Sequence, residues 1–196
     1  YNCAVDTLSI DIDTFTCAEI GPNNVILTVT DTAGNMASCT AIVTVEDITP
    51  PTVVCQDITV GLDATGTVTI DPSSLDGGST DSCGAGLFTY SASPDTFDCS
   101  NVGENTVILT VTDENGNSAT CETTVTVEDT TPPTLVCQDI TVQLDENGMV
   151  SIAAGDVIAS ADDACSIDAT TIDRDTFTCD DLGASVTVTV SATDAN

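Results

Sequence analysis

The sequence predicts an all-β chain of tandem sandwich repeats stapled by disulfides, and three observations lead to this fold class. The segment VEDITPPTVVCQDITV at residues 45–60 returns as VEDTTPPTLVCQDITV at residues 127–142, identical at fourteen of sixteen positions and starting 82 residues later. The ten cysteines recur with nearly the same period. Apolar and polar residues alternate over short segments, which is the period of a strand with one buried face. Self-similarity at a fixed period is typical of repeat architectures.

The end of each repeat predicts a β-hairpin. In residues 118–129 the side chains alternate, and one face carries Ala119, Cys121, Val125 and Val127. Residues 37–46 repeat the pattern, with an expected inner face of Ala37, Cys39, Ala41, Val43 and Val45. Residues 106–113 are the expected partner strand, joined through DENGN, because Asn and Gly accept the positive φ that a tight turn needs.

The start of each repeat predicts a second strand pair. Residues 55–63 and 65–71 are short, rich in β-branched side chains, and separated by a turn at Thr65-Gly66. Cys55 shares strand parity with Asp57 and Thr59 rather than with the apolar residues, so we expect a bulge or a bridge at the sheet edge there. No segment shows helical periodicity. Short strands separated by turns in a unit of about 82 residues indicate an immunoglobulin-like sandwich.

The recurring landmarks set the predicted domain boundaries. VTDTAGN at 29–35 returns as VTDENGN at 111–117, and DTFTC at 13–17 returns at 95–99 and 175–179 with one substitution in the middle copy. We expect residues 1–48 to form the C-terminal part of one immunoglobulin-like repeat and residues 49–130 a complete repeat. Residues 131–196 then form a repeat without its last strand, so the sequence reads as a window on a tandem array or as a subunit that needs neighbours.

The composition excludes several classes of function. The chain holds 32 acidic residues against one cation, Arg174, and the formal net charge of −31 excludes nucleic acid and anionic membranes as electrostatic partners. Neither His nor Lys occurs, which removes the commonest general base, metal ligand and Schiff-base former. No apolar run approaches the length of a transmembrane helix, so we expect no membrane insertion.

We expect no enzymatic activity. Pairs of carboxylates suited to glycoside hydrolysis occur at Asp11 with Asp13, Asp162 with Asp163, and Asp180 with Asp181. A general acid needs an apolar pocket that raises its pKa, whereas these residues lie in polar turns beside other acids.

The cysteines indicate disulfides in an oxidising compartment, because zinc sites need clustered ligands and no CxxC pair occurs. We predict four bridges: Cys3–Cys17, Cys55–Cys121, Cys83–Cys99 and Cys165–Cys179. Cys39 and Cys137 remain, and two explanations stay open for them. Either their partners lie outside this sequence, or Cys137 of one subunit meets the Cys39 strand of the next. Strand donation of the second kind closes sheet edges and builds head-to-tail filaments.

The combination VTDxxGNxAxC, a strand, and then EDxTPPxxxCxDITV resembles hyalin-type (HYR) immunoglobulin-like repeats, most specifically over residues 29–60 and 111–142. The resemblance spans the chain. It implies tandem modules of large secreted and cell-surface proteins, notably adhesins of Bacteroidetes-like bacteria, with an adhesive or stalk role and no catalysis. The near absence of Lys and Arg makes this chain unusually acidic for that family.

The junctions between repeats predict calcium sites. In an immunoglobulin-like sandwich the entering linker lies at the same end as the turn before the last strand, so Glu46 and Asp47 should approach Asp113, Asn115 and Asn117, with Asp76 or Asp81 nearby. At the next junction we expect Glu128 and Asp129 to approach Asp194 and Asn196. Converging carboxylate, amide and carbonyl oxygens are what Ca²⁺ requires, by analogy with cadherin-type junctions. The alternative is a plain hairpin turn beside a solvated strand end.

The function predicted from the sequence is a non-enzymatic extracellular building block of a cell-surface stalk, adhesin or filament, with neighbouring copies or repeats as partners. The alternative is an adhesion module that binds carbohydrate or protein, for which Phe88 and Tyr90 are the only clustered aromatic residues. Glycoprotein character is a further expectation. Asp-Thr-apolar motifs resemble a bacterial O-glycosylation acceptor at Thr7 and Thr32, and Thr130 lies in the related Asp-Thr-Thr.

Overall fold

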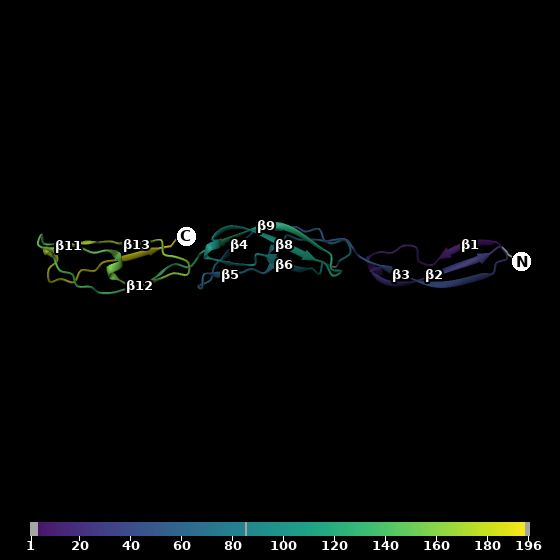
Figure 1. The fold of residues 1–196 in the computed structure, drawn as a ribbon, viewed down its shortest axis with the longest axis horizontal. Helices are drawn as coiled ribbons and strands as arrows, with labels where there is room; N and C mark the ends of the chain where they lie inside the picture. Colours follow the sequence, from purple (N-terminus) through teal and green to yellow (C-terminus); the bar gives the residue numbers. More distant parts are fainter. Residues whose placement is uncertain (1–3, 85, 195–196) are drawn as a thin grey trace. The chain divides into compact units, whose positions relative to one another are not determined.

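The structure is a computed structural model that describes residues 4–84 and 86–194. Its elements are β-strands and short 3-10 turns, in keeping with the all-β prediction, and the ribbon of Figure 1 traces them along the chain. No helix in the described ranges is long and apolar enough to cross a membrane. The chain divides into two compact units: residues 1–55 with 76–91 and 109–121, and residues 56–75 with 92–108 and 122–196. The repeat boundaries at 48 and 130 stay a prediction.

The first predicted repeat forms one antiparallel sheet in the order β1-β2-β3. Its elements are β1 (Val5–Ile10), η1 (Cys17–Glu19), β2 (Gly21–Asp31) and β3 (Met36–Val45). The strand expected at residues 37–46 is therefore confirmed. Cross-strand partners share a face, and the register places Leu8 opposite Val29, Ile10 opposite Leu27, and Leu27 opposite Cys39. The central part of one face of this sheet is thus apolar, while Asn23, opposite Val43, is polar.

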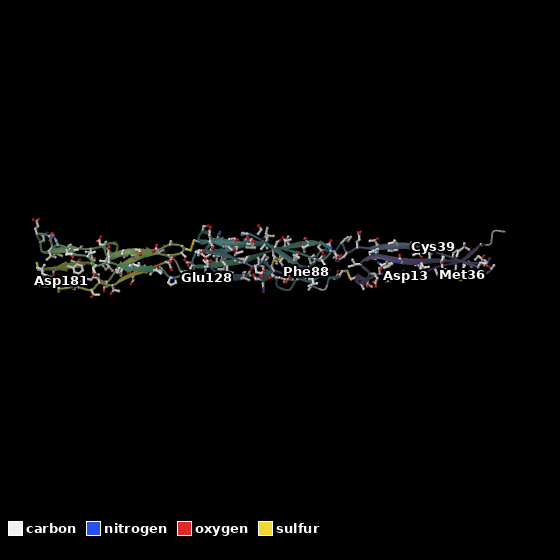
Figure 2. All side chains as sticks on the ribbon, turned by 90° about the horizontal axis from the view of Figure 1, so that it is seen from below. Asp13, Met36, Cys39, Phe88, Glu128 and Asp181 are labelled. Atoms are coloured by element: carbon white, nitrogen blue, oxygen red, sulfur yellow. A yellow bond between two sulfur atoms is a disulfide. The ribbon has the colours of Figure 1, made fainter. Side chains whose placement is uncertain are left out.

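That apolar face is only partly covered. Leu8 is 66% exposed and Cys39 is exposed, although the alternation predicts an inner face for β3. Cys39 and Met36 are labelled on this strand in Figure 2. The alternation therefore predicts correctly which face is apolar, but it does not predict whether a second sheet covers that face.

The middle repeat contains the best-formed core. Its elements are β4 (Ile58–Gly61), β5 (Thr67–Thr69), η2 (Pro72–Leu75), β6 (Thr89–Ser93), β7 (Thr96–Asp98), η3 (Cys99–Asn101), β8 (Gly103–Thr112) and β9 (Ser118–Glu128). One sheet has the order β4-β9-β8-β6 and the other pairs β5 with β7. The side chains that are almost fully buried between them are Leu75, Phe97, Val107, Leu109, Val111, Val125 and Val127. The expected β8–β9 hairpin is confirmed.

The strand pair expected at the start of this repeat is wrong. A tight turn does connect the segments, since the Asp63 N–H donates to the Thr67 carbonyl oxygen at 3.0 Å. The two strands nevertheless separate, because β4 pairs in parallel with β9 and β5 pairs with β7 in the other sheet. Cys55 precedes β4, and its backbone forms only an isolated β-bridge with Asp76. Because Cys55 lies outside the regular strand, it does not have to follow the alternation of apolar residues in β4.

The third predicted repeat has a smaller core. Its elements are β10 (Thr134–Cys137), β11 (Met149–Ser151), η4 (Ala154–Val157), β12 (Ile158–Asp162), β13 (Ala169–Ile172), β14 (Thr176–Thr178), η5 (Cys179–Asp181) and β15 (Val190–Thr193). Three two-stranded sheets pair β10 with β12, β11 with β14, and β13 with β15. Ile152, Val157 and Phe177 are buried between Val150 of one sheet and Ile172 of another. The prediction of disulfide-stapled, sandwich-like repeats holds.

Three disulfides form in the described residues: Cys17–Cys83, Cys55–Cys121 and Cys99–Cys165, each with a sequence separation of 66. The predicted Cys55–Cys121 bridge is present. The predicted bridges Cys3–Cys17, Cys83–Cys99 and Cys165–Cys179 are wrong, since a cysteine forms one bridge and Cys17, Cys83, Cys99 and Cys165 have other partners. Cys3 itself lies outside the described residues.

The error has a physical cause. Cys83 lies in the loop before β6, whereas Cys99 opens the turn after β7, where its sulfur lies against Gly66 and Ala164. Closeness in sequence suggested a local bridge, but the two cysteines face different neighbouring repeats. Cys39, Cys137 and Cys179 are exposed and form no disulfide within the described part of the chain.

Candidate metal centre

The turn between β8 and β9 holds one carboxylate in a fixed orientation. The Oδ1 atom of Asp113 accepts the backbone N–H groups of Asn115 at 2.9 Å and Asn117 at 2.8 Å, and its Oδ2 atom accepts the Asn117 side-chain amide at 2.9 Å. Gly116 supplies the left-handed conformation at φ +91° that closes the turn. Asp113 is only 6% exposed. The DENGN motif therefore forms the hairpin turn and also fixes the orientation of the Asp113 carboxylate.

The linker that follows β3 brings a second carboxylate to this turn. The Asp47 Oδ2 atom accepts the side-chain amide of Asn115 at 3.1 Å, and the Asp47 carbonyl oxygen accepts that of Asn117 at 3.1 Å. The Oδ1 atom of Asp47 accepts the Thr49 N–H at 3.0 Å. The two asparagines thus tie the linker to the hairpin through their N–H groups.

Asp81, in the loop before β6, completes the cluster. Its Oδ1 atom accepts the Cys83 N–H at 2.7 Å. Its Oδ2 atom is buried and has no hydrogen-bond partner among the residues that the structure describes. One carboxylate oxygen from each of Asp47, Asp81 and Asp113 lies within 4.8 Å of the other two.

An equivalent cluster forms one repeat later. Asp129, Asp163 and Asp194 each offer an oxygen within the same 4.8 Å limit, and Asp129 is 7% exposed. The Oδ1 atom of Asp129 accepts the Thr131 N–H at 3.0 Å, as Asp47 does with Thr49. The Oδ2 atom of Asp163 is buried and finds no partner within residues 4–84 and 86–194, as in Asp81. The same arrangement therefore occurs twice.

The electrostatics of the first cluster favour a cation. Burial raises the pKa of Asp113, but hydrogen bonds from Asn117, Asn115 and Gly116 outweigh it and hold that pKa below its ordinary value. Asp113 is therefore ionised at neutral pH beside two further acids. Like charges at this distance repel, and a buried oxygen without a partner costs free energy. Carboxylate oxygens are hard ligands, which fits Ca²⁺.

The predicted site residues have mixed outcomes. The structure brings together Asp47, Asp81 and Asp113 at one junction and Asp129 with Asp194 at the other. Neither cluster of acidic residues includes Glu46 or Glu128. The side-chain amides of Asn115 and Asn117 donate N–H groups to Asp47 and Asp113, and their role as oxygen ligands stays a prediction. Asp76 binds Ser79 and Tyr90 elsewhere. Asn196 lies outside the described residues.

Asp163 was missed as a junction residue, although the repeat itself contained the signal. Asp163 follows Asp81 by one period of 82 residues, as Asp129 follows Asp47. Applying the repeat spacing to every member of the first cluster would have found it.

The aromatic pair expected of a binding module is engaged internally. Phe88 and Tyr90 form an edge-to-face contact with ring centroids 6.3 Å apart, and the Tyr90 hydroxyl donates to Asp76 Oδ2 at 3.2 Å. Both residues are half-buried. Among the predicted O-glycosylation residues, Thr7, Thr32 and Thr130 are exposed, and their modification stays a prediction.

Comparison with known proteins places the middle of the chain in a family. Residues 46–127 match the HYR domain. The chain is 35% identical over 140 residues to hyalin of Strongylocentrotus purpuratus and 31% identical over 142 residues to hyalin of Lytechinus variegatus. These matches cover 68% and 67% of this chain, but only 11% and 26% of the two hyalins. The chain therefore contains an HYR domain and is distantly similar to hyalin.

Two solved structures show a weaker similarity. The extracellular cadherin domains 1–4 of protocadherin gamma B7 give a TM-score of 0.37 at 14% identity, covering 87% of this chain and 54% of that one. The protocadherin gamma B4 extracellular domain gives 0.35 at 14% identity, covering 87% and 34%. Scores of this size carry no conclusion, so the fold rests on the strands and cores described above.

Proposed function

We propose that this chain is a non-enzymatic extracellular structural module whose repeats are stiffened by calcium at their junctions, as part of a cell-surface stalk, adhesin or filament. The observation that carries the proposal is the repeated cluster of three aspartates with a buried, unpaired oxygen on Asp81 and Asp163. Each cluster joins the segment after one repeat's last strand to loops of the following repeat. A cation there links three separate segments of chain.

The setting supports an extracellular role. Three disulfides form among the described residues, and such bonds persist in oxidising compartments. Extracellular modules bind calcium with dissociation constants of about 10⁻⁴–10⁻³ M, which suits sites of few carboxylates. The overall charge of −31 also disfavours close packing of copies unless cations neutralise part of it.

Calorimetric titration of the full chain with calcium tests the proposal. We expect two sites, with Asp81→Asn removing one and Asp163→Asn removing the other, because each cluster loses its buried charge. Asp76→Asn is the matched control, since Asp76 lies in the same region but outside the cluster. Absence of calcium binding by the unmodified chain at millimolar concentration would contradict the proposal.

The third repeat supports the filament form of this function. A groove of about 720 Å³ runs between residues 137–144 and residues 181–190. The equivalent segments of the middle repeat are β4 and β8, and β9 lies between them in the sheet. In the third repeat residues 138–144 and 185–189 form no strand. The groove therefore corresponds to the position that β9 occupies in the middle repeat.

A second copy of the chain can fill that position with β3. β3 is the equivalent of β9, which pairs in parallel with β4 so that Val125 lies opposite Ile58. The edge of β3 that faces away from β2 corresponds to the edge that β9 uses for this pairing. Shifted by one repeat, that register places Val43 of one copy opposite Ile140 of another and brings Cys39 to Cys137. In this joint β2 takes the place of residues 185–189, which form no strand, and the joint replaces the hydrogen bonds of Thr189 with Asp173 and the packing of Val188 on the core.

The mass of the oxidised chain under non-reducing conditions tests this joint. We expect covalent oligomers that Cys39→Ser and Cys137→Ser each abolish, while Cys179→Ser leaves them intact. Strictly monomeric chains after oxidation would contradict head-to-tail assembly without affecting the calcium proposal.

A further inference from the structure

Two of the disulfides lie directly beside the acidic clusters. Cys83 and Cys165 follow Asp81 and Asp163 by two residues, and their partners Cys17 and Cys99 belong to the preceding predicted repeat. The third bridge, Cys55–Cys121, joins the two ends of a single repeat. Bridges between repeats and candidate cation sites therefore occur together, once at each junction.

A backbone hydrogen bond connects each bridge to its cluster. The Oδ1 atom of Asp81 accepts the Cys83 N–H at 2.7 Å, and that of Asp163 accepts the Cys165 N–H at 2.8 Å. The other oxygen of each carboxylate is the buried, unpaired one. The position of the bonded cysteine thus sets the direction in which the unpaired oxygen points.

The loop that carries Cys83 has backbone freedom that the bridge restrains. Gly84 and Gly86 follow Cys83, Gly86 has φ +77°, and glycine has the largest backbone freedom to lose. A disulfide reduces the conformational freedom of the chain that it closes. Without the bridge, the loop retains the glycines but not the restraint.

The other end of each bridge is firmly held. Cys17 begins a 3-10 turn whose Thr16 and Glu19 form reciprocal capping hydrogen bonds. Cys99 begins the equivalent turn, capped by Asp98, and packs where a side chain on Gly66 would lie 2.8 Å from its sulfur. Each bridge therefore ties a glycine-rich or polar loop to a rigid anchor.

We infer that the inter-repeat disulfides are positioning elements of the cation sites, so that Cys17–Cys83 controls calcium binding at Asp47, Asp81 and Asp113, and Cys99–Cys165 controls it at Asp129, Asp163 and Asp194. This inference rests on the proposed function of the clusters. Reduction of a bridge adds two electrons and two protons to give two thiols. With dithiothreitol as donor, the reductant closes into its cyclic disulfide. The calcium affinity of the adjoining cluster then falls.

Calcium titration of paired serine variants tests the assignment of each bridge to its cluster. In Cys17→Ser/Cys83→Ser we expect one of two sites to weaken at least tenfold while the other keeps its affinity. In Cys99→Ser/Cys165→Ser the pattern reverses, and adding Asp163→Asn or Asp81→Asn identifies the surviving site. Each variant is the other's control, because the unaffected site reports that the chain is folded. Unchanged affinity at both sites would overturn the inference while leaving the proposed function intact.

Linkage gives a second test that needs no variant. If a bridge strengthens calcium binding, calcium must oppose reduction of that bridge to the same degree. Alkylation of newly formed thiols during titration with dithiothreitol, followed by mass spectrometry, measures each bridge separately. We expect calcium to protect Cys17–Cys83 and Cys99–Cys165 and to leave Cys55–Cys121 unchanged. Equal behaviour of all three bridges would contradict the inference. A chain that binds no calcium fails the proposed function instead.

Discussion

Strands β2 and β8 have almost the same sequence but differ in burial. Residues 24–31 read NVILTVTD and residues 106–113 read TVILTVTD. On the outer face Ile26 and Ile108 are 43% and 44% exposed. On the inner face Leu109 is fully buried, whereas its equivalent Leu27 is only half-buried. The strand sequence therefore determines which face is inner, and the opposing sheet determines how deeply that face is buried.

The largest test of this difference removes the bridge that closes the middle repeat. Cys55→Ser/Cys121→Ser should lower the free energy of unfolding by about 4 kcal/mol, because the bridge closes a loop of 66 residues in the unfolded chain. Cys39→Ser, at the position equivalent to Cys121, should leave it unchanged. Chemical denaturation monitored by circular dichroism measures both, and an equal loss from Cys39→Ser would contradict the comparison.

A core substitution tests the same difference within one strand pair. Leu109→Ala should cost about 3 kcal/mol, because it leaves a cavity in a core that is fully enclosed. Leu27→Ala should cost less than about 1.5 kcal/mol, since water already reaches that side chain. Equal losses in urea unfolding would show that the β1-β2-β3 sheet is covered in solution.

Acid should reveal a contact of the middle repeat that the described residues of the third repeat do not make. The Asp57 carboxylate accepts the Thr124 N–H at 2.8 Å and the Thr123 hydroxyl at 2.9 Å, and these bonds hold its pKa below the ordinary value. A lowered folded-state pKa contributes stability above the unfolded value of about 3.9 and loses it as the pH falls toward the folded value.

Asp57→Asn should therefore remove part of the stability at neutral pH and reduce its loss below about pH 4. Asp139→Asn is the control, because Asp139 occupies the same position in the third repeat, where no strand equivalent to β9 is present among the described residues. Unfolding midpoints measured from pH 7 to pH 2 compare the two. Parallel curves for Asp57→Asn and the unmodified chain would exclude this role.

The smallest expected effect comes from the outer face. Ile26→Thr and Ile108→Thr should each change the free energy of unfolding by no more than about 0.5 kcal/mol, and by the same amount, because the two side chains are equally exposed. A clear difference in their denaturation midpoints would mean that one outer face has a partner.

Local patterns predicted strands well and long-range pairing poorly. Alternation identified β9, and the DENGN motif identified its hairpin with β8, because both signals arise within a few residues. The separation of β4 and β5 into different sheets depends on β7 and β9, more than 25 residues away. The bridges to Cys83 and Cys165 depend on the adjoining repeat, which no spacing within one repeat reveals.

The candidate site was predicted in part for the same reason. Asp47 and Asp113 belong to motifs that recur, and the expected proximity of linker and hairpin turn brought them together correctly. Glu46 precedes Asp47 but is not part of the cluster. The alternation at the end of the strand could not show which of these two carboxylates reaches the hairpin turn. The burial of the Asp81 Oδ2 atom depends on the folded conformation of its loop, so the sequence alone could not predict it.

Anomalous scattering from crystals grown with terbium, a trivalent substitute for calcium, tests the central claim most directly. We expect two peaks, one among Asp47, Asp81 and Asp113 and one among Asp129, Asp163 and Asp194, both displaced by excess calcium. Bound terbium at other acidic residues with neither cluster occupied would contradict the account.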